Sequence, residues 1–427
     1  MKLKLKRRII FTGKTKRTRR LALVSLAGMF ALSEAAQAQS VIAPPPSVSV
    51  TPSAMRDLPP GEMQVFTPAS SFSDFLDNVQ LLQWGPVTVR PHVNYQFVSS
   101  SGIQSAPGQS HDATIQTVSP GVLFEISPHW TLDYTPTLTF YSGTNFQNTL
   151  EHTATLTGGT AFENWTFGLS QAFNYSSSPD VQTGTQVTQE NFSTAISAAR
   201  PLNSKMSVDL GASQNLDFVE GFQDSKQWAT MDWLNYQFWP RLVVGVGAGF
   251  GYVQAVPDNV SEQFQGRVNW RATDKISFSI NAGGEYTEFL SGGANPLLNP
   301  VFGASIQYQP FDHTQLSLTA NRAVSTSYFQ NAVTENTSVS ADLNQRLLKN
   351  FYLDVNAGYN TVDYVASASV LSTNRTDNTY SLNVQLSTTF FKRVSTAVFY
   401  RYSDNRSTMN GFTYKSNQVG FNVGYQF

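Results

Sequence analysis

Histidines and carboxylates are the side chains of this 427-residue chain that could carry acid–base, nucleophilic or metal chemistry. The histidines are dispersed, with no pair at the spacing of metal ligands. They are His92, His111, His129, His152 and His313. Only His111 and His152, beside Asp112 and Glu151, could converge to support a hydrolase. Because cysteine is also absent, we expect no enzyme, no metal site and no cofactor.

A second set of charged residues shares its side of the predicted strands with Thr, Ser, Asn, Gln and Gly. The set is Arg90, Glu125, Asp133, Glu151, Asp209, Arg267, Arg271, Glu285, Asp342, Arg346, Asp354 and Arg401. Scattered charges on a polar face are typical of a water-filled lumen, and we predict that these residues line a pore. With five basic and seven acidic members, the set predicts at most a weak preference for cations.

The last stretch of the sequence shows what kind of element positions these residues. Val419, Phe421, Val423, Tyr425 and Phe427 alternate with small or polar residues, which is the two-residue period of a strand that is apolar on one face. The closing strand of a soluble β-protein would show the same pattern. A terminal Phe, however, resembles the last strand of bacterial outer-membrane barrels. This resemblance implies that Phe421, Val423, Tyr425 and Phe427 form a signal for the assembly machinery.

From Pro86 onward the sequence repeats a strand, a polar loop, a returning strand and a tight turn. The turns fall at 127–129, 163–164, 201–205, 239–241, 273–275, 310–313, 348–350 and 391–393, and the loops near 99–111, 143–148, 178–187, 220–226, 255–260, 290–299, 326–335, 365–376 and 403–412. Eight turns and nine loops predict an all-β, antiparallel, up-and-down barrel of about 18 strands over residues 86–427, with 16 strands as the alternative.

The composition favours a membrane barrel over a soluble one. After the N-terminus no run of 18 apolar residues occurs, which excludes a helical membrane protein. Aromatic residues stand beside the turns, as in the girdles of membrane barrels. These are Trp130, Trp165, Trp239, Phe351, Phe390 and Phe427. Since an open sheet edge would leave unpaired amides in hydrocarbon, the first strand, near 87–97, should pair with the last.

One predicted strand has a row of glycines on its inner face. Gly245, Gly247, Gly249 and Gly251 alternate there with the apolar residues of 242–250. Glycines in this position could ease the curvature of the sheet. They could also leave room for a docked segment, and the sequence alone leaves both explanations open.

Residues 1–38 have the pattern of a cleaved signal peptide. Ten Lys and Arg lie between Lys2 and Arg20, a short apolar core follows, and Ala36-Gln37-Ala38 matches a cleavage site. Arg19-Arg20 leaves a twin-arginine export route open. Removal of these residues leaves 18 basic and 28 acidic residues, a net charge of −10. So acidic a chain argues against nucleic acid as a partner.

Residues 39–85 are rich in proline and predict an extended periplasmic segment. Within it, apolar residues from Phe72 to Leu82 recur at three- and four-residue spacing, which predicts a short amphipathic helix at 71–82. The helix could plug the pore, rest on the membrane surface or lie under the barrel rim.

The C-terminal third, residues 343–427, resembles the putative β-barrel porin type 2 family. The resemblance lies in Arg375-Thr376-Asp377-Asn378 at the start of a strand, in the polar stretch 400–407, and in 417–427. Over 86–340 it consists only of the hairpin rhythm.

The resemblance implies a porin-like channel of the Gram-negative outer membrane, reached through the cleaved signal peptide. Its cargo would be small hydrophilic solutes, or it would be the outer-membrane conduit of an exopolysaccharide secretion system. Expected partners are outer-membrane lipid, the barrel assembly machinery and periplasmic polysaccharide-export proteins. A non-conducting structural or adhesive surface barrel is the alternative.

Overall fold

The computed structural model describes residues 82–127, 129–180, 182–291, 295–327, 329, 332–366, 375–391 and 393–426. The predicted signal peptide at 1–38, residues 39–81 and Phe427 lie outside these residues. The helix predicted at 71–82 is therefore undescribed except for Leu82, which is wrongly included because it begins a strand. The expectations for those parts therefore stay predictions. Among the described residues we find no helix with the length and hydropathy needed to span a membrane.

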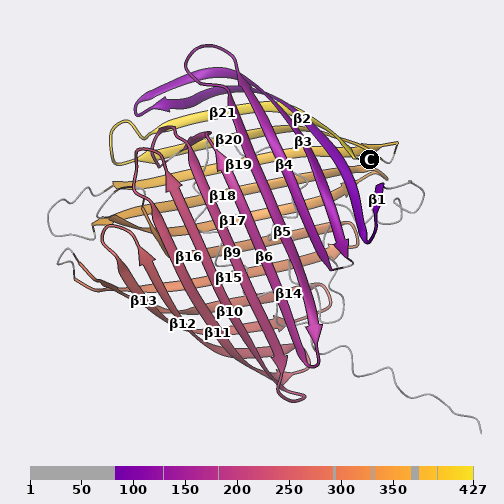
Figure 1. Ribbon diagram of the computed structural model, residues 1–427, viewed down its shortest axis with the longest axis vertical. Coiled ribbons are helices and arrows are strands. Elements are labelled where there is room, and N and C mark those ends of the chain that lie inside the picture. Colours follow the sequence, from indigo (N-terminus) through magenta and orange to yellow (C-terminus); the bar gives the residue numbers. More distant parts are fainter. Residues whose placement is uncertain are drawn as a thin grey trace, which may run out of the picture.

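Long antiparallel strands make up almost all of the described chain (Figure 1). They are β2 (Val87–Ala106), β3 (Gln109–Ser127), β4 (Trp130–Tyr141), β5 (Thr149–Phe162), β6 (Trp165–Ser176), β9 (Gln189–Pro201), β10 (Met206–Val219), β11 (Ser225–Trp239), β12 (Leu242–Gln254), β13 (Asn259–Arg271), β14 (Ile276–Phe289), β15 (Leu297–Phe311), β16 (Thr314–Thr326), β17 (Ala332–Leu347), β18 (Phe351–Ala366), β19 (Arg375–Phe390), β20 (Val394–Ser407) and β21 (Tyr414–Gln426). Three short strands are added: β1 (Leu82–Trp84) beside β2, and the pair β7 (Pro179–Asp180) and β8 (Thr185–Gln186) between β6 and β9.

The sheet closes on itself. Each long strand pairs with its neighbour in the chain, and β21 pairs with β2 from His92 opposite Gln426 to Ser101 opposite Asn417. Without the edge piece β1, the 19-stranded sheet is a ring of 18 strands. The predicted barrel, its strand count and its closure are confirmed. Closure satisfies the backbone of the first and last strands, which an open sheet in hydrocarbon could not do.

The connections also follow the prediction, with one correction. Short turns join β3 to β4, β5 to β6 and the later pairs at the end where β2 begins and β21 ends. The loop predicted near 99–111 is wrong, because β2 and β3 continue to Ala106 and Gln109 and leave only a two-residue turn. The Ser-rich stretch resembled a loop, but its backbone is paired with β3 and β21. Gly102, at a bulge with φ of 72°, passes close to the carbonyl of Lys415.

The two faces of the sheet have opposite character, and this confirms the alternation seen in the sequence. In β21, Val419, Phe421 and Val423 are exposed on the outer face, whereas Gln418 and Asn422 are buried on the inner face. Elsewhere the outer face carries apolar side chains such as Phe264 and Val246, 74% and 65% exposed. Apolar groups outside and polar groups inside are the reverse of what a soluble protein needs, and are the pattern of a barrel in lipid.

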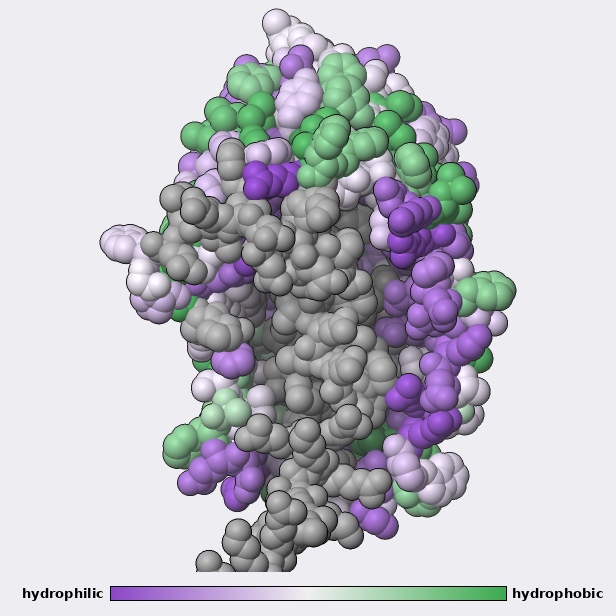
Figure 2. All heavy atoms as spheres, turned by 90° about the vertical axis from the view of Figure 1, so that its right-hand side faces the viewer, coloured by the Kyte–Doolittle hydropathy of each residue, from purple (hydrophilic) through white to green (hydrophobic). Residues whose placement is uncertain are grey.

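Large aromatic side chains mark the end with the short turns. Trp239 and Phe390 are exposed there, and the ring of Trp130 lies over the bare backbone of Gly158. Figure 2 looks onto the side of the barrel where β1 and the C-terminal end lie; hydrophobic residues gather over its upper part and hydrophilic residues along its right-hand edge. Aromatic rings at strand ends suit the depth of the lipid headgroups.

The glycines of β12 are covered by side chains from the neighbouring strands. A Cβ on Gly247 would lie 2.6 Å from the ring of Trp233, which is the residue opposite it in β11. A Cβ on Gly245 would lie 2.6 Å from Asn235 Oδ1. The glycines therefore do leave room on the inner face. That room is filled by side chains of the neighbouring strands, such as Trp233 and Asn235, and not by a docked segment. The effect of the glycines on curvature stays a prediction.

Two glycines on adjacent strands test this packing. In Gly247→Val the new side chain meets the Trp233 ring, so we expect the free energy of unfolding to fall by about 1–3 kcal/mol. Gly266→Val, on the outer face of β13 with nothing within 4 Å of its added Cβ, should be neutral or stabilising. Both changes alter the unfolded chain alike, so urea unfolding of the reconstituted proteins reports the native packing. Equal unfolding curves would contradict the explanation.

Candidate functional site

The strand registers place the charged residues predicted for the lumen on the inner face of the sheet. These are Arg90, Glu125, Asp133, Glu151, Asp209, Arg267, Arg271, Glu285, Asp342, Arg346, Asp354 and Arg401. The structure brings some of them together in pairs and leaves others apart on the wall. That they line a conducting pore stays a prediction.

Most arginines of the inner wall have a carboxylate or a backbone carbonyl close to the guanidinium. Arg90 Nη2 lies 2.9 Å from Glu125 Oε2 at the start of the barrel wall. Arg271 Nη2 is 3.7 Å from Asp274 Oδ1, and Arg346 Nη2 donates to the Lys349 carbonyl at 2.6 Å. The ion pairs of Arg90 and Arg271 act at a distance as dipoles and add little field to the lumen, whereas Arg346 is bonded to a neutral carbonyl and keeps its charge.

Several inner carboxylates are held by neutral donors instead. Glu151 accepts a hydrogen bond of 2.6 Å from Ser178, Glu285 accepts one of 3.2 Å from Thr287, and Asp342 accepts one of 3.2 Å from Ser317. Hydrogen bonds from hydroxyls orient a carboxylate but leave its charge in place. Among the described residues, Glu151 and Glu285 have no basic partner, so their negative charge is not compensated there.

A compact network braces the inner wall of β10 to β13. Arg267 forms an ion pair with Asp209, and its Nε donates to Asn235 Oδ1 at 2.7 Å. Asn235 Nδ2 donates to Asp209 Oδ2 at 2.9 Å, which closes a ring of three side chains, and the guanidinium lies 4.5 Å from the Trp233 ring centroid. Because these groups are buried and bonded to one another, we assign them a structural role.

The connection between β6 and β9, residues 177–188, reaches across the lumen; we call it the crossing loop. Gln182 Nε2 donates to Ser327 Oγ at 2.8 Å, beyond the end of β16. The Gln182 carbonyl accepts from Arg375 Nη1 at 2.9 Å, at the start of β19. Since β10 to β15 separate β9 from β16 along one side of the ring, these contacts span the lumen. The loop narrows the barrel at the end opposite the short turns.

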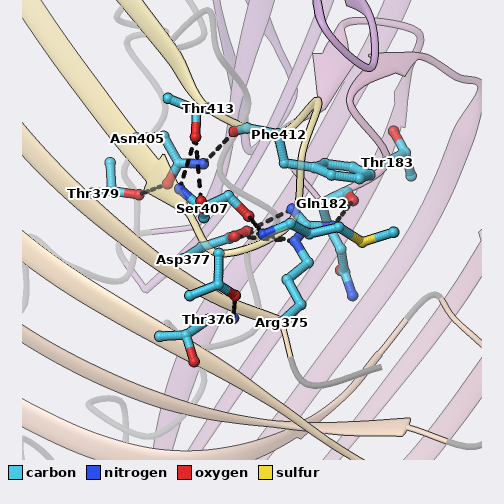
Figure 3. Close-up of polar contacts among 12 residues, drawn as sticks. Gln182, Thr183, Arg375, Thr376, Asp377, Thr379, Asn405, Ser407, Phe412 and Thr413 are labelled. Atoms are coloured by element: carbon cyan, nitrogen blue, oxygen red, sulfur yellow. Dashed lines mark hydrogen bonds and ion pairs between the residues drawn. The ribbon is translucent and has the colours of Figure 1, made fainter. Parts of the chain in front are cut away.

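Arg375 is the anchor of the crossing loop (Figure 3). Its Nε lies 3.0 and 2.9 Å from the two carboxylate oxygens of Asp377, and its Nη2 lies 2.5 Å from Oδ2. The guanidinium is 3.6 Å from the ring centroid of Phe412 and 4.6 Å from that of Tyr364. Arg375 and Asp377 are 3% and 2% exposed. A fork held by a carboxylate and two rings has little freedom to move.

Asn405 holds the next loop against this anchor (Figure 3). It is fully buried, accepts from Thr379 Oγ1 at 2.7 Å, and donates through Nδ2 to the Phe412 carbonyl at 2.7 Å. The Gly108 amide, at the tip of the hairpin of β2 and β3, donates to the Gly411 carbonyl at 2.6 Å. Three connections far apart in sequence therefore meet at one end of the lumen.

Asp180 is a buried carboxylate within the crossing loop. It is 2% exposed, and Oδ1 accepts from the Thr183 amide at 2.9 Å, while Oδ2 has no hydrogen-bond partner within the described residues. Burial raises the pKa of Asp180 to about 6, although hydrogen bonds from Thr183 and Gln182 and the charge of Arg375 act in the opposite direction. The protonation state of this loop changes near neutral pH.

Asp180, Arg375 and Asp377 were not among the functional residues predicted from the sequence. Arg375 and Asp377 appeared there only as part of a family pattern. Two opposite charges separated by one residue share one strand face, and this signal could have predicted their ion pair. Nothing in the local sequence indicates that the pair would bind the carbonyl of Gln182, 193 residues away.

The histidines do not form a catalytic group in the described chain. His152 lies on the outer face, where Nδ1 is 2.9 Å from the hydroxyl of Tyr134, whereas Glu151 faces the lumen. These two members of the candidate hydrolase site therefore cannot converge. His92 Nε2 lies 3.3 Å from Asp133 Oδ2 on the inner wall. The described residues contain no group of three or more side chains suited to metal binding.

Comparison with protein families agrees with this architecture. Residues 266–427 match the family model Putative beta-barrel porin 2. The match begins within β13 and runs to the end of the chain, so it covers the anchor of the crossing loop. The match includes residues 343–427 and agrees with the family resemblance seen there in the sequence. A search of curated protein sequences gave no match.

The solved structures to which this chain is similar include three bacterial proteins. OccAB3 of Acinetobacter baumannii is 8% identical, with 79% of this chain and 99% of that chain covered and a TM-score of 0.45. OpdQ of Pseudomonas aeruginosa is 10% identical, with 80% of this chain and 97% of that chain covered and a TM-score of 0.44. OccK2 of the same organism is 11% identical, with 79% of this chain and 98% of that chain covered and a TM-score of 0.43. At these TM-scores the similarity carries no argument about function.

Removal of the anchor should release the crossing loop. Arg375→Ala leaves Asp377 buried without its cation, so we expect the free energy of unfolding to fall by about 3–5 kcal/mol. Limited proteolysis should then produce new cuts within 177–188. Arg406→Ala is the matched control, because Arg406 pairs with Asp404 on the exposed outer face, and its effect should stay below about 1 kcal/mol. Protection of the loop in the Arg375→Ala protein would contradict its role as anchor.

Docking of the crossing loop should depend on pH through Asp180. Its pKa of about 6 in the folded loop lies above the usual aspartate value of 3.8, so protonation favours the docked state. That stabilisation is full below pH 3.8 and is lost as the pH rises through about 6. Hydrogen–deuterium exchange of residues 182–188, corrected for intrinsic rates, should therefore speed up over this interval. An identical profile in Asp180→Asn would exclude Asp180 as the cause.

Proposed function

We propose that this protein is a porin-like channel of the outer membrane that passes small hydrophilic solutes. The observation that carries the proposal is a closed ring of 18 strands with an apolar outer face and a polar inner face. Barrels of 16 to 18 strands are wide enough to leave an aqueous channel, whereas those of about eight are filled by side chains. The family match over 266–427 supports the same reading.

The crossing loop supports small solutes over polymers. Its contacts with Ser327 and Arg375 hold it across the lumen, so an extended chain would have to pass a fixed obstacle. For an exopolysaccharide conduit we find no supporting observation in the described residues. The acidic excess of the wall supports a weak preference for cations.

The second candidate is a non-conducting structural or adhesive surface barrel. The fixed crossing loop is the observation that favours it, because a lumen narrowed at one end could be shut entirely by a second segment. The predicted helix at 71–82 would be such a segment. For assembly, we propose that Phe421, Val423, Tyr425 and Phe427 are read by the barrel assembly machinery; the first two are exposed to lipid on the outer face of β21.

Conductance decides between the two functions. Protein reconstituted in planar bilayers should give single-channel steps with a weak cation preference that fades as salt screens the wall charges. If residues 39–84 close the lumen, the intact chain will be nearly silent and the chain lacking 39–84 will conduct. Before each recording, a shift in gel migration on boiling checks that the barrel is closed. Folded protein that is silent in both forms would overturn the channel.

A further inference from the structure

Arg401 differs from the other arginines of the inner wall. Arg90, Arg267 and Arg375 each pair with a carboxylate, and Arg271 and Arg346 bind groups of the short turns. Arg401 stands near the middle of β20, opposite Asn383 of β19 and Gln418 of β21. Its Nη1 is buried and has no hydrogen-bond partner among the described residues. Its guanidinium lies against the ring of Phe399, whose centroid is 4.3 Å away.

The residues beside Arg401 on the inner wall include Phe399 and Asn383. Phe399 lies over Gly420, where a Cβ would come within 2.6 Å of the ring. The Phe399 ring in turn carries the guanidinium. Asn383 Oδ1 is also buried without a hydrogen-bond partner among the described residues. Because a side-chain amide can be turned over, Asn383 can present either its oxygen or its NH2 group to a ligand beside Arg401.

No nearby carboxylate on the wall compensates Arg401. Along the row of paired residues, Arg401 is followed by Asn383, Asn356 and Asp342. In this register the backbone of Asp342 is three strands from that of Arg401, and the backbone of Asp354 is two strands and two residues away. With about 4.8 Å between strands and about 3.3 Å per residue, these backbone separations are about 14 Å and about 12 Å, beyond the Debye length of about 8 Å at physiological salt. Asp342 also accepts hydrogen bonds from Ser317 and Asn356. A shielded guanidinium without an acceptor is costly, so an acceptor from outside the wall would stabilise it.

We infer that Arg401 is the binding point of the lumen for a small oxyanion. The planar fork of the guanidinium matches two oxygens of such an ion, the Phe399 ring fixes its orientation, and Asn383 supplies a further hydrogen bond. Arg90, Arg267 and Arg375 are less suited to this role, because each already has its charge compensated by a carboxylate. The inference rests on the proposed channel function, since the anion reaches Arg401 through the lumen.

Block of the channel by inorganic phosphate tests the site. Phosphate should reduce the conductance of the wild type at millimolar concentration. In Arg401→Gln the half-blocking concentration should rise about tenfold, the loss expected for one charge-assisted hydrogen-bonded contact. Arg401→Lys keeps the charge without the planar fork of the guanidinium, so its half-blocking concentration should lie between those of the wild type and Arg401→Gln. Arg90→Gln removes one positive charge from the same wall and controls for net charge, so its block by phosphate should stay within about twofold of the wild type.

A second measurement does not require conduction. Thermal unfolding of the detergent-solubilised proteins with and without phosphate should show a larger stabilisation for the wild type than for Arg401→Gln, because a ligand stabilises the state that binds it. Arg90→Gln should match the wild type and accounts for the general salting effect of phosphate. Equal block and equal stabilisation in the wild type and Arg401→Gln would overturn the anion site. A silent barrel with a selective phosphate shift would overturn the channel and retain the site.

Discussion

Pairing of β21 with β2 is the interaction on which the rest of the structure depends. A sheet in hydrocarbon must satisfy every backbone amide within itself, because lipid offers no hydrogen-bond partner. The pairing from His92 to Ser101 with the last strand removes the only two free edges that the ring would otherwise have. Once the ring is closed, the strand period assigns every side chain either to lipid or to the lumen.

Closure moves the polar groups to the inside, where they need partners of their own. Over β10 to β13 the wall meets this need with Asp209, Asn235 and Arg267, and glycines of β12 leave the space that these side chains occupy. At the loop-bearing end, the pair of Arg375 and Asp377 serves two purposes. It neutralises buried charge and it holds the carbonyl of Gln182, so the position of the crossing loop follows from the need to satisfy a buried guanidinium.

The sequence was sufficient for the barrel because its signals are local. Alternation along each strand, and turns such as that at 239–241, depend on neighbouring residues, and they predicted the strand count and the inner face. The Ser-rich stretch at 99–105 was misassigned because its polar residues are paired with β3 and β21 and bonded to the β20–β21 loop, contacts that polarity in the sequence does not reveal. The crossing loop could not be predicted, because its position depends on contacts with Ser327 and Arg375 that lie more than 140 residues away.

Arg375 and Arg401, on adjacent strands, show how the residues two positions away decide whether an arginine is held in the structure or can bind a ligand. Arg375 has Asp377 two residues further along β19, on the same face, so its charge is met within its own strand. Arg401 has Phe399 and Ser403 at the corresponding positions of β20, and neither can accept a full positive charge. Arg375 is therefore fixed by an ion pair, whereas Arg401 on the same wall has no carboxylate in its own strand to pair with. A carboxylate at i±2 is the feature that distinguishes them in the sequence.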